Sequence, residues 1–155
     1  RPFTVSAERA GDDVFVTLSV GGQLCGIPVG VVRDVLREQR ITRIPLAPPE
    51  VAGSLNLRGR IVTAIDLSRR LALPPPAPGV PRMSVVVDRQ GDLYSLLVDR
   101  VDEVLALPRA GLEPHPPTLD ETWRAASCGV HRLSDRLMVV LDVERLLDLG
   151  GATRH

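Results

Sequence analysis

An internal repeat limits how this chain can fold more than any other feature of its sequence. At an offset of 69 residues, six positions keep their residue type: Gly22/Gly91, Leu24/Leu93, Val29/Val98, Val32/Val101, Val35/Val104 and Leu36/Leu105. A seventh, Asp34/Glu103, keeps its acidic character. At an offset of 76, six more keep their residue type: Gly53/Gly129, Leu57/Leu133, Arg60/Arg136, Asp66/Asp142, Arg69/Arg145 and Leu71/Leu147. Two similar units are therefore expected, and since each is too small to bury much surface alone, they should pack on each other.

Most of the repeated segments have the pattern of β-strands, with β-branched residues and alternation of apolar and polar side chains. The expected strands cover residues 14–20, 23–29, 35–44, the two arms of 53–66, 83–88, 93–98, 101–107, 126–133 and 136–142. A helical turn is expected at 30–34, with Val32 and Val35 on one face, and short helices at 68–73 and 143–149. Five short strands per half with a cap helix suit a small closed barrel, because closure leaves no exposed edge. The prediction is an all-β fold of two five-stranded barrels packed together.

Changes in composition divide the chain. Residues 1–12 are polar without periodicity, so we expect a flexible arm, and 150–155 form a tail. The segment 74–81 is rich in proline and is expected to be a stiff, polyproline-like linker. It separates 13–73, expected as the first barrel, from 82–149, expected as the second.

The segment 53–66 contains a tight corner, Asn56-Leu57-Arg58-Gly59, between two apolar runs. Gly59 can adopt the positive φ of such a turn, which places Arg58 at the lip with its guanidinium pointing outward. A solvated turn arginine is the simplest interpretation. The repeat favours another, because Arg58 falls on Ser134 and the fold therefore does not require it. Arg58 is a candidate for contact with a partner.

The aspartates behave differently under the repeat. Asp66 and Asp142 coincide, each at the start of an expected helix, where a carboxylate can cap free backbone N–H groups. A residue that recurs in this way is predicted to be structural.

Composition and charge argue against several classes of protein. With 19 acidic and 19 basic residues the net charge is zero, which speaks against a nucleic-acid or anionic membrane surface. Two Phe, one Tyr and one Trp are too few for a base-stacking platform. No apolar run is long enough to span a bilayer, no signal-peptide pattern opens the sequence, and two cysteines cannot form a disulfide framework. We expect a soluble cytoplasmic protein.

The thiols and imidazoles do not form a convincing catalytic or metal site. Cys128 and His131 are three apart, a spacing that puts the two side chains on opposite faces of a strand. No phosphate-binding glycine loop or nucleophile elbow is present. We expect no enzyme activity, no catalytic residue, no metal site and no cofactor.

Several motifs resemble the CheW-like chemotaxis coupling family. They are Gln23–Val29, the turn 32–35, Ile44-Pro45, Val51-Ala52-Gly53, Asn56-Leu57-Arg58-Gly59, 61–67 and 97–104. The resemblance covers about residues 14–149. It implies two intertwined five-stranded SH3-like barrels and a non-catalytic adaptor that couples chemoreceptors to the chemotaxis histidine kinase. Such a protein is cytoplasmic, is attached to membrane receptor arrays only through its partners, and pairs with a kinase regulatory domain of the same fold.

The resemblance also implies which residues make contact. Arg58 matches the family arginine associated with the receptor, and Val32 and Val35 match apolar positions that face a groove between the barrels. Asp34 matches an acidic position beside them. The expected receptor-binding residues are Val32, Asp34, Val35, Asn56, Leu57 and Arg58, and the expected kinase-binding residues are Ile41 and Ile44.

Three positions depart from the family pattern. Thr63 stands where proline is common, Cys25 where an aromatic residue is frequent, and Ser95 where a small apolar residue or glycine is usual. These departures fit a specialised coupling protein that serves a divergent receptor–kinase system.

Two alternatives stay open. The first residue is not methionine, so the chain could be a regulatory domain excised from a kinase or from a coupling–receiver fusion. A nucleic-acid-binding small barrel is the other, with its best basic run in Arg33, Arg37, Arg40 and Arg43, although acidic residues interrupt that run.

Overall fold

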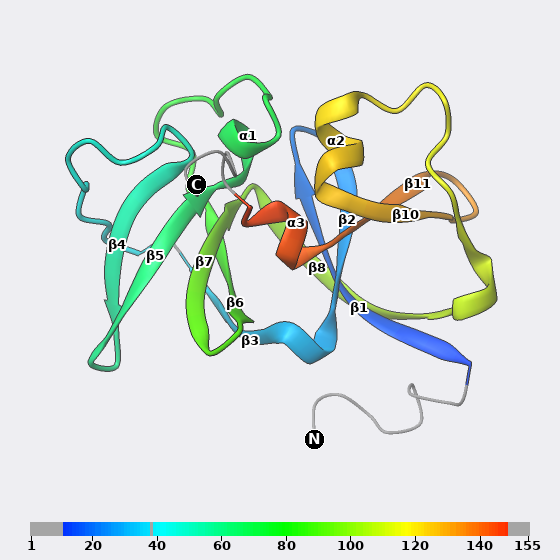
Figure 1. Cartoon of the computed structure of the whole chain (residues 1–155), viewed down its shortest axis with the longest axis horizontal. Helices are drawn as coiled ribbons and strands as arrows, with labels where there is room; N and C mark the ends of the chain where they lie inside the picture. Colours follow the sequence, from blue (N-terminus) through cyan, green and yellow to red (C-terminus); the bar gives the residue numbers. More distant parts are fainter. Residues whose placement is uncertain (1–10, 38, 149–155) are drawn as a thin grey trace.

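The computed structural model describes residues 11–37 and 39–148, and within them the fold is almost entirely β (Figure 1). The strands are β1 Asp12–Val20, β2 Gln23–Pro28, β3 Val32–Leu36, β4 Val51–Leu57, β5 Arg60–Asp66, β6 Met83–Arg89, β7 Asp92–Val98, β8 Arg100–Pro108, β9 Leu112–Glu113, β10 Ser127–Arg132 and β11 Leu137–Leu141. The helices are short: α1 Leu67–Arg70, α2 Glu121–Ala126 and α3 Val143–Leu146, with 3₁₀ turns η2 Val29–Val31 and η3 Arg109–Gly111.

The strands form two sheets that lie side by side in Figure 1. One has six strands in the order β8-β1-β2-β11-β10-β9, and the other has five in the order β3-β6-β7-β5-β4. The two orders match position by position: β8, β1, β2, β11 and β10 of the first sheet correspond to β3, β6, β7, β5 and β4 of the second. The parallel pair β2–β11 then corresponds to the parallel pair β5–β7. The internal repeat is thus a structural repeat, and the prediction of an all-β fold with two packed units and short cap helices is confirmed.

The two halves of the sequence are intertwined. The first hairpin of each half, β1–β2 or β6–β7, lies in the sheet built mainly by the other half, because it pairs there with β8 and β11 or with β3 and β5. The first barrel is therefore not made by 13–73 alone, nor the second by 82–149 alone. Local sequence patterns cannot reveal this exchange, since the pairing joins strands that are distant in the chain.

Each sheet is closed into a barrel by the segment that follows its edge strand. In the five-stranded sheet the chain leaves β3 and returns at Thr42, whose N–H and C=O both bond to Ser54 of β4 at 2.8 Å. In the six-stranded sheet the chain leaves β8 through η3 and pairs as β9 with β10.

A glycine allows each closing segment to approach. Gly53 and Gly129 sit at matching bulges with φ of 149° and 158°. A Cβ at Gly53 would lie 2.1 Å from the carbonyl oxygen of Thr42, and one at Gly129 would lie 2.6 Å from that of Glu113. These two glycines keep register in the sequence because the barrels cannot close around a side chain at either position.

The two barrels share one hydrophobic core. Its fully buried members come from both sheets and include Leu18 and Ile27, Ile65 and Leu96, and Leu141. The capping helices begin as expected: Asp66 accepts from the Ser68 N–H, and Asp142 accepts from the Glu144 and Arg145 N–H groups. The structural role predicted for both aspartates is confirmed.

Two local expectations between residues 30 and 44 are wrong. The helical turn expected at 30–34 is the 3₁₀ turn η2, which ends at Val31, followed by strand β3. The strand expected at 35–44 ends at Leu36, because the polar residues 37–40 offer no apolar side chain to a core. Of the expected arm, residues 1–10 lie outside the described residues and Asp12 already begins β1; the tail also lies outside them.

Candidate partner-binding surfaces

The corner that carries Arg58 is a two-residue hairpin turn between β4 and β5. Leu57 pairs with Arg60, and the two residues between them have positive φ, 51° at Arg58 and 87° at Gly59. This is the pattern of a type I′ turn, in which Asn, Asp and Gly are the usual residues. Asn56 supports it by accepting the Gly59 N–H on Oδ1 at 2.9 Å. An arginine at such a position costs about 1 kcal/mol, so the sequence tolerates Arg58 against the preference of the turn.

The Arg58 side chain forms an ion pair but stays largely in solvent. Its Nη2 donates to Oδ2 of Asp34 at 3.1 Å, while 74% of the arginine side chain and 28% of the aspartate side chain remain exposed. Exposed pairs of this kind contribute only about 0.2–1 kcal/mol. A carboxylate or carbonyl group of a partner could therefore engage the remaining guanidinium N–H groups, with Asp34 holding the fork in place.

The two valines expected beside Arg58 differ in exposure. A bulge between Val32 and Asp34 places Val32 opposite Val87 and Val35 opposite Val85, so the two valines share a face of the sheet. Val32 packs against the shared core, whereas Val35 is 39% exposed. The shared face expected for the two valines is therefore present, although a bulged strand and not a helical turn produces it. Leu57 is also turned inward, toward the cluster of Leu55, Val62 and Ala64. Of the six residues proposed for the receptor, the structure brings Asp34 and Arg58 into contact, and Val35 is the next residue of β3 after Asp34.

Ile61 was missed as a surface residue. It pairs with Asn56 across the hairpin and is 71% exposed, although its neighbour Val62 is fully buried. The alternation of 61–66 could have revealed this, since Val62 and Ala64 occupy the inward positions. Ile61 gives the corner an apolar contact next to its charged one.

A second exposed apolar surface lies on the loop 43–49. Ile41 is partly buried against the Leu55 cluster, but Ile44 is 42% exposed and Leu46 is completely exposed. Leu46 also has a φ of 63°, which is costly for a leucine. The loop borders a cavity of about 370 Å³ whose far wall includes Asp66 and Arg69. Leu46 was not singled out in the sequence because it stands among prolines with no periodic pattern.

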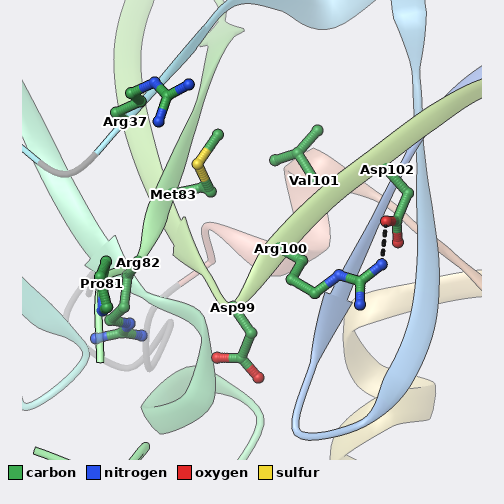
Figure 2. Close-up of a pocket in the computed structure, with 8 residues that line it drawn as sticks. All are labelled: Arg37, Pro81, Arg82, Met83, Asp99, Arg100, Val101 and Asp102. Atoms are coloured by element: carbon green, nitrogen blue, oxygen red, sulfur yellow. Dashed lines mark hydrogen bonds and ion pairs between the residues drawn. The ribbon is translucent and has the colours of Figure 1, made fainter. Parts of the chain in front are cut away.

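A groove between the two barrels is the third surface (Figure 2). Its volume is about 560 Å³, and it lies where β3 ends and where β6 and β8 begin. Met83 and Val101 occupy its middle, Arg37 lies at one end, and the Arg100–Asp102 ion pair, at 2.6 Å, lies at the other. An apolar floor between charged ends suits an amphipathic helix.

The candidate nucleophiles have environments unsuited to chemistry. Burial raises the pKa of the Cys25 thiol far above its usual value. Cys128 is exposed at the surface, where partial desolvation and the charge of Asp142 raise the pKa of its thiol. Thiols with raised pKa are poor nucleophiles. Burial lowers the pKa of His131, whose ring packs edge-on against Phe15 at 5.7 Å.

Neither a metal cluster nor a membrane-spanning helix is found in the part of the chain that the structure describes. No group of three or more His, Cys, Asp or Glu side chains there could hold a metal ion. The helices of the described residues are all too short or too polar to cross a bilayer.

Comparisons with known proteins point in one direction. A family model described as CheW-like domain matches residues 14–150. The chain is 25% identical over 144 residues to the probable chemotaxis protein CheW of Rhizobium etli, covering 93% of each sequence. It is 24% identical over 144 residues to the chemotaxis protein CheW of Bacillus subtilis, covering 93% of this chain and 92% of that protein. The crystal structure of the scaffolding protein TtCheW from Thermoanaerobacter tengcongensis matches with a TM-score of 0.80 and 28% identity, over 90% of this chain and 94% of that one.

Proposed function

Since this chain belongs to the CheW-like domain family, whose members are non-catalytic chemotaxis scaffolds, we propose that it couples a chemoreceptor to a chemotaxis-type histidine kinase through separate surfaces. It would act in the cytoplasm, where receptor tips and kinase meet. The observation that carries the proposal is the exposed arginine at the β4–β5 corner, which the turn disfavours and the repeat does not require.

We assign the receptor surface to Arg58, Asp34 and Val35, with Ile61 added. A receptor tip is a helical hairpin, so its apolar ridge would contact Val35 and Ile61 while a carboxylate or carbonyl takes the guanidinium fork. Asn56, Leu57 and Val32, also expected at this surface, would support it from behind by holding the turn and β3. Their hydrogen bond and their packing favour that role over direct contact.

The inter-barrel groove would extend this surface. Strand β3 connects the two, because Asp34 pairs with Arg58 and Arg37 lines the groove. Three strand residues span about 10 Å, so a single receptor helix could contact both. Met83 and Val101 would then supply the apolar floor.

We assign the kinase surface to Ile41 and Ile44, extended by Leu46. The regulatory domain of the kinase has the same fold, and it would cover the exposed apolar side chains of the loop 43–49. The Leu46 side chain buries no apolar surface in the free protein, and its positive φ costs conformational energy. Leu46 therefore does not stabilise the free protein, which favours a role in binding.

Binding of each partner by two charge-altered variants tests this proposal. Arg58→Glu should weaken binding to the organism's own receptor hairpin and leave kinase binding intact, while Leu46→Asp should do the reverse. Arg136→Glu is the matched control, because Arg136 is the exposed arginine beside the equivalent turn of the other barrel. Equal losses for Arg58→Glu and Arg136→Glu would refute the assignment.

A further inference from the structure

The C-terminal end of α3 is held by arginines from the other barrel. Arg70, at the end of α1, donates from Nε to the Leu146 carbonyl at 2.7 Å and from Nη2 to the Arg145 carbonyl at 2.9 Å. Arg89, at the end of β6, donates from Nη1 to the Leu147 carbonyl at 3.2 Å. The last carbonyls of a helix lack partners within its regular turns, and the guanidinium groups supply donors to those of Leu146 and Leu147. The Arg145 carbonyl also accepts the backbone N–H of Asp148 at 3.2 Å. In Figure 1, α3 lies between the two sheets, where this bridging is possible.

Glu144 of α3 extends the contact to the turn between β6 and β7. Its Oε1 accepts from Arg89 Nε at 3.0 Å and from Gln90 Nε2 at 3.2 Å. Gln90 and Gly91 both have positive φ, 55° and 93°, so this is a second two-residue turn of the type I′ pattern. The Glu144 carboxylate thus binds both Arg89, at the end of β6, and Gln90, in the turn.

The far side of the same turn touches the elements that carry the receptor surface. Asp88 accepts the Gly91 N–H at 2.8 Å and faces Arg33 at 3.5 Å. The Gly91 carbonyl lies 3.4 Å from Nη2 of Arg60. Arg33 is the neighbour of Asp34, and Arg60 follows the corner of Arg58. The turn therefore stands between α3 and both members of the exposed ion pair.

The repeat shows that this arrangement is not required by the fold. The positions equivalent to Arg70, Arg89, Gln90 and Glu144 are Leu146, Val20, Gly21 and Ser68, none of which could reproduce the charged contacts. The other cap helix, α1, is built without them.

We propose that Glu144 and Arg89 are positioning residues, through which α3 of one barrel holds the β6–β7 turn and so fixes the hairpin that carries Arg58. The arrangement of the partner surface would then depend on the docking of α3, which belongs to the other barrel. The link to receptor binding rests on the proposed function; the mechanical link does not.

Hydrogen exchange of the full chain tests the mechanical link. In Glu144→Gln, which keeps the shape of the side chain, peptides covering 86–94 and 51–66 should exchange roughly twofold or more faster. Glu113→Gln is the matched control, since it breaks an exposed ion pair of similar geometry, with Arg132 at 2.9 Å, away from the turn. Arg89→Lys, which keeps the charge but not the fork, should give a smaller increase in the same peptides. Faster exchange at 86–94 with no change at 51–66 would overturn the proposal, as would a uniform increase that includes β10 and β11.

Measuring receptor binding distinguishes a failure of this inference from a failure of the proposed function. Glu144→Gln should weaken binding of the receptor hairpin roughly two- to tenfold, and should add no further loss once Arg58→Glu is present. Altered exchange at 51–66 with unchanged receptor affinity would leave the positioning role intact and refute the receptor surface. Unaltered exchange would refute the positioning role, whatever the affinity.

Discussion

At the scale of single residues, Arg58 shows a conflict between the preference of the turn and the binding role proposed for it. Its φ of 51° suits Asn or Gly, so Arg58→Asn should raise the free energy of unfolding by about 0.5–1 kcal/mol. The same change removes the guanidinium fork and should weaken receptor binding. Urea unfolding and a binding titration on the one variant measure both effects. A variant that is less stable than the parent would show that the ion pair with Asp34 matters more than the turn.

His131 gives a second prediction at this scale. Burial lowers the pKa of its imidazole, and the carboxylates of Asp13 and Glu113 offset this only in part. Because the folded pKa lies below the unfolded value of about 6.5, the unfolded chain binds the proton more readily. The contribution of neutral His131 to the free energy of unfolding is therefore fully present above pH 6.5 and is lost as the pH falls below that value.

Thermal unfolding between pH 7.5 and 5 measures that loss. The parent should lose more stability over this range than His131→Gln, which cannot take up the proton. Asp66 does not interfere. Burial raises the pKa of its carboxyl, but the hydrogen bonds from Arg82 and Ser68 outweigh burial and lower it overall, so its contribution is lost only in more acidic solution. Parallel pH profiles for the two proteins would contradict the prediction.

At the scale of elements, the closing segments of the barrels depend on their glycines. Gly53→Ala would put a Cβ 2.1 Å from the Thr42 carbonyl oxygen, so the bridge to β4 must break. The expected cost is more than about 2 kcal/mol in the free energy of unfolding. Gly22→Ala is the control: its φ is 84°, but a Cβ there meets nothing within 4 Å, and about 1 kcal/mol is expected. Equal costs in chemical denaturation would mean that the bridge contributes little to closure.

Elements were predictable from the sequence wherever the signal was local. The hairpins at Gly21-Gly22, Arg58-Gly59 and Gln90-Gly91 combine turn residues with alternating strands, and all three are observed. The region 30–44 was not predictable in this way. There a spacing of i, i+3 between two valines suggested a helix, whereas pairing of β3 with β6, about 50 residues away, imposes a strand.

The residues of the candidate site also differ in whether the sequence alone could identify them. Arg58 was identifiable because the repeat lacks its counterpart, and that reasoning needed no structure. Its pairing with Asp34 joins the two edges of a closed sheet, a contact that no local pattern encodes. Exposure was predicted only in part. Val32 was placed at the surface and Leu46 was overlooked, whereas the outward position of Ile61 was readable from the alternation of 61–66.

At the scale of the whole molecule, the exchanged hairpins and the shared core make the two barrels one folding unit. Each half supplies the hairpin that pairs with β8 or β3 of the opposite sheet, and α3 is capped by groups of the other barrel. Neither half can complete a sheet by itself. We therefore expect a single unfolding transition, with the calorimetric enthalpy equal to the van't Hoff enthalpy.

The linker provides the decisive version of this prediction, because residues 74–81 are exposed for most of their length and form no strand or helix. Cleavage at a protease site inserted between Ala77 and Pro78 should leave the native circular dichroism spectrum and a single transition, now dependent on concentration, since the fragments are held by the sheets and the core. Separated under denaturing conditions, each fragment alone should remain unfolded, and mixing should restore the native spectrum. A fragment that folds alone would show that one barrel is complete without the other's hairpin, and the dependence of the partner surface on α3 would lose its structural basis.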